Sequence, residues 1–134
     1  MTYFHINESV FNEIWPIDVG YQELSLPVDQ AKSIKNNYPY FLMHYVASGK
    51  CYVTIDGKTN TSSKGDIFII FPHCDVEYKG DDKVGWEYYW INFNGTKAIN
   101  LLKKVGITKN KYYQSIKNNT NNSSSNLSTN TSEY

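Results

Sequence analysis

The middle of the chain is a series of short apolar segments separated by glycine-containing turns. Residues 40–46 are aromatic and aliphatic throughout, apart from one histidine, and residues 51–55 alternate between apolar and polar side chains. Period-two alternation is typical of a strand with one buried face. Asp56-Gly57 follows directly, and this dipeptide favours a two-residue hairpin because both turn positions need a positive φ. These residues therefore predict an antiparallel sheet.

Three further strand segments continue this pattern as far as the middle nineties. The expected strands lie at residues 67–71, which Pro72 ends, 76–78 and 86–93, and the expected turns at residues 48–50, 64–66 and 80–82. Strands at such close and regular spacing, with glycine in the turns, are typical of a barrel or sandwich. We expect residues 21–94 to form an antiparallel barrel.

An amphipathic helix is expected after the last strand, over residues 96–105. Its apolar side chains fall at i, i+3, i+4 and i+7, at Ala98, Leu101, Leu102 and Val105. Asn94 or Thr96 is suited to cap the start, and Gly106 stands where a left-handed residue ends a helix. We expect the helix to pack on the barrel through Leu101, Leu102 and Val105.

The last segment differs sharply in composition. From residue 118 onward the chain is Asn, Ser and Thr, interrupted only by Leu127, Glu133 and Tyr134. Such a stretch buries too little apolar area to offset the entropy lost on ordering it. We therefore expect two parts: a barrel with its N-terminal arm and packed helix over residues 1–107, and a polar tail, disordered or truncated, over residues 108–134.

The charge balance argues against nucleic-acid binding by these residues. Thirteen basic residues match thirteen acidic ones, whereas phosphate-backbone binding needs a basic surface. Two cysteines cannot define a disulfide framework. The first 14 residues lack the basic and apolar pattern of a secretory leader, and no apolar run reaches the roughly 18 residues of a membrane span. A cytoplasmic location without membrane association is expected.

Four motifs occur in a fixed order: YVASGK at residues 45–50, VTIDG at 53–57, GDIFIIFP at 65–72 and WEYYWINF at 86–93, followed by the helix with Leu101-Leu102. In this order and spacing the set resembles the N-terminal cupin-type effector-binding domain of AraC-family transcription regulators, over roughly residues 15–107. The resemblance implies an all-β, cupin-like double-stranded antiparallel β-barrel (jelly roll) with a C-terminal α-helix. It also implies a homodimer for a full-length regulator, and a monomer or weak dimer for this chain.

The strand at residues 86–93 carries the binding hypothesis. Alternation places Trp86, Tyr88, Trp90 and Asn92 on one face. By resemblance to the arabinose-sensing member of the family, Tyr88 and Trp90 match sugar-contacting positions, Tyr78 matches another pocket residue, and Trp15 matches an N-terminal contact. Tyrosine and tryptophan suit a sugar because their rings stack on it while polar groups bind its hydroxyls. The alternative is that these aromatic side chains only fill the barrel.

His44 lies in the middle of an expected strand and has two interpretations. It is either a histidine hydrogen-bonded in or near the core, or a polar contact to a ligand. His73 replaces a glycine in a turn and is expected to face solvent.

An enzyme is the alternative class, since some cupins hold a catalytic metal with two or three histidines and a carboxylate. This chain has only His5, His44 and His73, without a His-x-His pair, and no nucleophile motif. We expect no catalytic residues, metal or cofactor. The favoured function is a ligand-sensing domain for a small-molecule effector, a carbohydrate, with DNA bound only through a C-terminal domain missing from these residues. The alternative function is a small cupin enzyme such as a sugar isomerase or epimerase.

Overall fold

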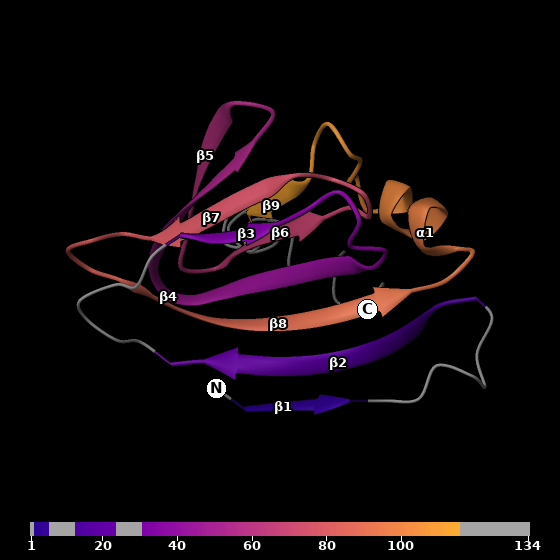
Figure 1. Cartoon of the computed structure of the whole chain (residues 1–134), viewed down its shortest axis with the longest axis horizontal. Helices are drawn as coiled ribbons and strands as arrows, with labels where there is room; N and C mark the ends of the chain where they lie inside the picture. Colours follow the sequence, from indigo (N-terminus) through magenta and orange to yellow (C-terminus); the bar gives the residue numbers. More distant parts are fainter. Residues whose placement is uncertain (1, 6–12, 24–30, 116–134) are drawn as a thin grey trace, which may run out of the picture.

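The computed structural model describes residues 2–5, 13–23 and 31–115, with the side chains of residues 3–5 excepted. All the strands in these ranges pair in antiparallel fashion (Figure 1). In chain order the elements are β1 (Thr2–His5), β2 (Trp15–Gln22), β3 (Lys32–Ile34), β4 (Phe41–Ile55), β5 (Lys58–Ser63), β6 (Asp66–Ile70), β7 (Val76–Gly80), β8 (Trp86–Asn94), α1 (Ala98–Lys104) and β9 (Tyr113–Ser115). The expectation of an all-β fold with one helix after the last long strand is confirmed.

The 15-residue strand β4 belongs to two sheets. Its first part pairs with β8 and β6 in a sheet of order β1-β2-β8-β4-β6-β9, and its second part pairs with β5 and β7, with β3 added beside β7. Figure 1 shows β4 curving from one sheet into the other. Among the described strands, β1 and β9 end the longer path without pairing to each other. The two sheets thus enclose a core without closing into a continuous hydrogen-bonded barrel.

The turn expected at residues 48–50 is wrong, because β4 runs through it. Gly49 has a φ of +72°, and a Cβ there would lie 2.1 Å from the carbonyl oxygen of Gly85. The pairing with β8 shifts register between Val46 and Ser48. A glycine next to a bulge bends a strand without ending it. The expected turn is therefore the bend at which β4 passes between the sheets.

The hairpin expected at Asp56-Gly57 is confirmed. Both residues have positive φ, +51° and +76°, and they join β4 to β5. Strand β5 was not expected, because its side chains are polar (KTNTSS) and show no apolar alternation. It forms a strand because the Asp56-Gly57 turn folds it back onto β4, from Ile55 opposite Lys58 to Lys50 opposite Ser63.

The helix packs differently from the expectation. It begins at Ala98 and ends at Lys104, with Lys97 in the cap position, so neither Asn94 nor Thr96 takes the cap. Ala98 is fully buried and Leu102 is partly buried. Leu101 and Val105, which were also expected to pack on the barrel, are 44% and 57% exposed.

The end of the helix explains this difference. Gly106 has a φ of +83°, and its N–H donates to Lys103 O (3.0 Å) while that of Ile107 donates to Leu102 O (2.9 Å). This pattern reverses the chain direction and brings the residue after the glycine back to the helix. Ile107 is buried as a result, in the role that Val105 was expected to have.

The packed part of the chain extends beyond the boundary expected at residue 107. Strand β9 pairs with β6, and Tyr112, just before it, is buried. The expectation of a tail beginning at residue 108 is corrected to this extent. The Asn, Ser and Thr segment from residue 118 lies outside the described residues.

Candidate functional site

A cavity of about 180 Å³ lies between the two sheets. Side chains of β3, β4, β7 and β8 line it: Lys32, Leu42, His44, Tyr78, Tyr88, Trp90 and Asn92. Its exposed lining is about equally polar and apolar. Four of the five residues expected from the sequence therefore surround one space. Trp15, the fifth, is not in the lining and pairs with Asn94 at the start of β2.

Strand register explains why these side chains meet. In the antiparallel pair β4–β8, His44 lies directly opposite Trp90, and Leu42 directly opposite Asn92. Directly opposite residues project to the same face of a sheet, which here is the inner one. Along β8, Tyr88 is 2% exposed whereas its neighbour Tyr89 is 53% exposed, as the alternation predicts.

One end of the interior is filled with aromatic rings. Trp86 stacks on Tyr88 with ring centroids 3.9 Å apart, and it also lies near Phe68 and Tyr78. Offset or edge-on contacts of this kind stabilise a core. Trp86 does not line the cavity. For this residue, the alternative interpretation is correct: its side chain fills the core.

The indole of Trp90 rests against the backbone of β2. Gly20 lies opposite Trp90 in the β2–β8 ladder, and a Cβ on Gly20 would lie 2.3 Å from two carbons of the indole ring. Only glycine leaves room for the ring at this distance. Gly20 therefore positions Trp90 as one wall of the cavity.

His44 is buried without the hydrogen bond that a core histidine normally makes. It is 1% exposed, and its Nδ1 atom has no hydrogen-bond partner among the described residues. Burial, with a smaller contribution from the charge of Lys32, lowers the pKa of His44 to about 3. The imidazole is therefore neutral near pH 7, and His44 contributes an uncharged polar side chain to the lining of the cavity.

Lys32 brings a cation to the same space. Its Nζ donates a hydrogen bond to the Tyr88 hydroxyl (3.0 Å) and lies 5.7 Å from the centroid of the Tyr88 ring. Much of the residue is exposed, so Lys32 marks the side on which the cavity opens. Within the described ranges, no carboxylate forms an ion pair with Lys32.

Asn92 is held in place by its neighbours. Its Oδ1 accepts a hydrogen bond from the Tyr38 hydroxyl (2.5 Å), and its Nδ2 donates to Asp18 Oδ1 (2.5 Å). Burial, followed by the charge of Asp18, raises the pKa of Tyr38 to about 12. Tyr38 thus stays protonated as a donor, and the network fixes the amide at the cavity wall.

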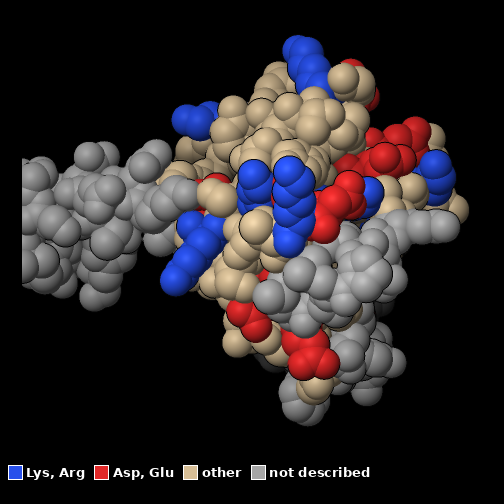
Figure 2. Space-filling view, turned by 90° about the vertical axis from the view of Figure 1, so that its left-hand side faces the viewer, with Lys and Arg blue, Asp and Glu red and all other residues tan. Residues whose placement is uncertain are grey.

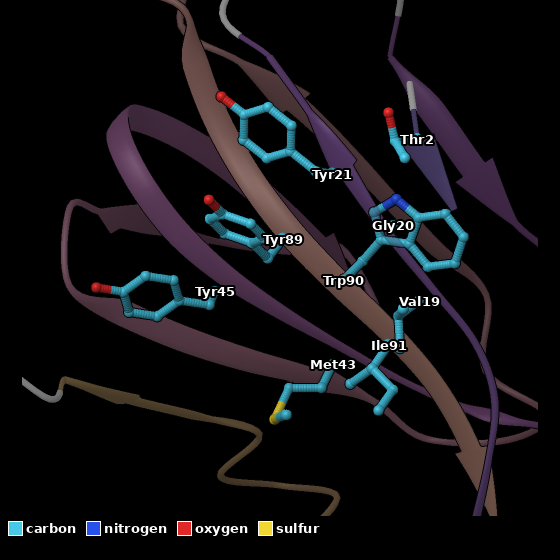
Figure 3. A pocket seen from close by; sticks show the side chains of 9 residues that line it. All are labelled: Thr2, Val19, Gly20, Tyr21, Met43, Tyr45, Tyr89, Trp90 and Ile91. Atoms are coloured by element: carbon cyan, nitrogen blue, oxygen red, sulfur yellow. The ribbon is translucent and has the colours of Figure 1, made fainter. Parts of the chain in front are cut away.

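A second hollow, of about 390 Å³, lies mainly on the opposite face of the sheet formed by β1, β2, β8 and β4, and the side chain of Trp90 borders both hollows. Its lining is almost wholly carbon. Figure 3 shows the rings of Tyr21, Tyr45 and Tyr89 on one side of it, and Met43 and Ile91 on another. Ligand specificity usually comes from a few convergent polar groups. The inner cavity has such groups, and we therefore take it as the candidate site.

The surface charges are mixed on the face shown in Figure 2, where lysines lie beside carboxylates. The ion pairs of the structure include Lys50 with Asp81 at 3.7 Å and Lys79 with Asp82 at 2.8 Å. Among the described residues, no three His, Cys, Asp or Glu side chains come together as metal ligands. Within the same ranges, no helix has the length and apolar character needed to span a membrane.

Sequence reasoning missed Lys32 and Asn92 as lining residues. Alternation along β8 had already placed Asn92 on the face of Tyr88 and Trp90, so the signal for Asn92 was present. Lys32 had no comparable signal. It reaches the cavity because β3 pairs with β7, opposite Tyr78, and a three-residue strand carries no recognisable pattern.

Comparison with known proteins identifies the family of this chain. Residues 28–128 match the model of the AraC-like ligand binding domain. Two curated relatives are regulators. The chain is 35% identical over 83 residues to the Msm operon regulatory protein of Streptococcus mutans, covering 62% of this chain and 29% of that protein. It is 30% identical over 94 residues to the lactose operon transcription activator of Staphylococcus xylosus, covering 68% and 33%. The chain thus spans about a third of the length of these relatives.

Solved structures share the fold. The protein YhaK from Escherichia coli superposes with a TM-score of 0.55 at 10% identity, over 84% of this chain and 48% of that one. The cupin domain of Cnp3 from Schizosaccharomyces pombe superposes with a TM-score of 0.50 at 18% identity, over 81% and 71%. At these identities the likeness concerns the fold alone, and it confirms the expected cupin-like architecture.

Proposed function

Since this chain belongs to the AraC-like ligand-binding domain family, we propose that it senses a carbohydrate effector for a transcription regulator. The effector binds in the inner cavity, in contact with His44, Tyr78, Tyr88 and Trp90. Binding of DNA resides in a part of the regulator outside these 134 residues.

The observation that carries this proposal is the mixed lining of the inner cavity. The aromatic side chains of Tyr78, Tyr88 and Trp90 give the lining apolar surface, while His44 and Lys32 contribute polar atoms. Carbohydrates present both an apolar ring face and hydroxyl groups, and this combination matches them. The cavity volume of about 180 Å³ is below the roughly 300–1,000 Å³ of pockets for drug-sized ligands. A single sugar ring is therefore favoured over a longer saccharide.

Effector binding acts on transcription by shifting a conformational equilibrium. A ligand shifts such an equilibrium only by the difference in its affinity for the two states. Strand β3 is the natural element to respond, because it has only three residues and carries Lys32 at the cavity opening. In a full-length regulator, the response would change contacts with the N-terminal arm or a partner subunit and so reposition the DNA-binding part.

A sugar panel tests the effector proposal. A ligand at a hundred times its dissociation constant adds about 2.7 kcal/mol to the free energy of unfolding, which is readily detected as a thermal shift. Trp90→Ala is expected to abolish the shift given by a sugar that binds. Tyr89→Ala is the matched control, because Tyr89 is adjacent in β8 but projects to the other face. Because Trp90 also borders the outer hollow, loss of binding in Tyr89→Ala, alone or together with Trp90→Ala, would place the ligand in the outer hollow and contradict the proposal.

The second candidate function is a small cupin enzyme such as a sugar isomerase or epimerase. The curated relatives, which are regulators, favour the sensor. Metal analysis of the purified protein separates the two functions, since a stoichiometric transition metal together with turnover of a sugar would support the enzyme. For the sensor, we expect these residues to give no specific gel shift of DNA at physiological salt.

A further inference from the structure

The charges around the inner cavity are not balanced. Lys32 contributes a cation to the lining, and the other lining residues in the described part of the chain include no carboxylate. The carboxylate of Asp18, behind the wall, is already hydrogen-bonded to the amide of Asn92. His44 is neutral near pH 7 because its pKa is lowered to about 3, so it adds no compensating charge. The described lining residues therefore carry a net charge of one positive unit.

Lys32 and Tyr88 together form a pair of donors. The Tyr88 hydroxyl accepts its hydrogen bond from Lys32 Nζ at 3.0 Å, which leaves the hydroxyl proton free to be donated elsewhere. An ammonium group has three N–H donors, and only one is used in this contact. Two donors 3.0 Å apart, one of them charged, are close enough to bind the same carboxylate or phosphate group.

From this arrangement we infer that the effector is an acidic sugar, whose carboxylate or phosphate group binds Lys32 and the Tyr88 hydroxyl. The inference rests on the proposed function and specifies its ligand class. The sugar ring occupies the space beside Trp90 and His44, and the anionic group points toward the open side, where Lys32 is exposed.

The position of the Lys32 charge at the opening of the cavity also agrees with the free-energy cost of removing an anion from water. A fully buried anion would lose its hydration, and pairing with one cation would not fully compensate for this loss. At a partly exposed opening, the anionic group and the Lys32 ammonium keep some contact with solvent. The protein still excludes part of the water, so that their electrostatic attraction is stronger than in bulk water. The neutral part of the ligand is the part that enters the dry interior.

Matched pairs of sugars test the inference. Galactose and glucose are each compared with their uronic acid and their 6-phosphate, by calorimetric titration of the wild-type chain. At least one acidic member is expected to bind about tenfold or more tightly than its neutral parent. Lys32→Met is expected to remove this preference, because it keeps the length of the side chain and removes the charge. Lys35→Met, at an exposed lysine outside the lining, is expected to keep it.

The outcomes separate the two proposals. Tight binding of a neutral sugar, with no gain from the acidic group and no effect of Lys32→Met, overturns the acidic ligand and leaves the sugar sensor intact. Failure of every sugar in both sets to bind the folded chain overturns the sensor and the acidic ligand together. Preference for the uronic acids assigns a carboxylate to the site, and preference for the 6-phosphates assigns a phosphate. Either preference, lost in Lys32→Met alone, supports the inference.

Discussion

The imidazole of His44 lies nearly parallel to the ring of Phe68, with centroids 4.5 Å apart and an interplanar angle of 11°. This stacking joins β4 to β6, which are paired strands with His44 directly opposite Phe68. His44 therefore has two parts with different roles. Its ring face packs in the core, whereas its Nδ1 atom is buried without a hydrogen-bond partner among the described residues.

His44→Phe is expected to fold and to lose ligand binding. Phenylalanine keeps the stacking on Phe68 and removes a buried polar atom, and an unsatisfied buried polar group costs about 1–3 kcal/mol. The free energy of unfolding near pH 7, measured by urea denaturation, should thus be equal to or higher than that of the wild type. Binding of a sugar that stabilises the wild type should disappear. A large loss of stability would mean that Nδ1 makes a hydrogen bond in the native protein.

The stability of the wild type should fall as the pH is lowered below about 6.5. The pKa of His44 is lowered in the folded state to about 3 from 6.5, so the unfolded chain binds a proton between these values and the folded chain does not. Stability from this group is therefore fully present above about pH 6.5 and declines toward pH 3, by at most about 1.4 kcal/mol for each pH unit.

His44→Phe is also the control for this pH effect. Urea denaturation of the variant at about pH 7.5 and about pH 5 should show a smaller difference than the wild type. Carboxylates with lowered pKa values, such as Asp81 and Glu87, lose their contribution only in more acidic solution. Equal slopes in the two proteins between these pH values would contradict the assignment to His44.

Gly20→Ala is expected to weaken sugar binding without contacting the ligand. The added Cβ would lie 2.3 Å from the indole of Trp90, so the ring must move away from β2 and into the cavity. Ligand affinity should fall about tenfold or more, and tryptophan fluorescence should change. Val19→Ala, at the neighbouring position lining the outer hollow, should leave the affinity unchanged. An unaltered affinity in Gly20→Ala would mean that Trp90 does not form the wall.

Substitutions around the helix should separate the buried positions from the exposed ones. Ile107→Ala removes a buried side chain, and such changes typically cost about 2–5 kcal/mol. Leu101→Ala and Val105→Ala alter exposed side chains and should change the free energy of unfolding by about 0.5 kcal/mol or less. Thermal or urea denaturation checks the order. Equal losses at residues 101 and 107 would mean that the helix packs through the stripe expected from its periodicity.

Local patterns in the sequence were sufficient for much of the site. Alternation along residues 86–93 placed Tyr88 and Trp90 on one face because strand geometry sends successive side chains to opposite sides. The resemblance to the AraC family then indicated that this face points inward. The hairpin at Asp56-Gly57 was equally local, since its two residue types favour the positive φ values that the turn requires.

Only the tertiary structure decided which distant residues complete the cavity and which expected ones do not. Lys32 reaches Tyr88 across 56 positions of the chain through the pairing of β3 with β7, and Trp15 is kept out of the lining by its register at the start of β2. The role of Gly49 could not be predicted from the sequence, because a glycine with positive φ can either end a strand or bend it. In the folded chain, the close approach of Gly49 to Gly85 accompanies a bend in β4. Periodicity is encoded over a few neighbouring residues, whereas strand pairing depends on contacts between segments far apart in the chain.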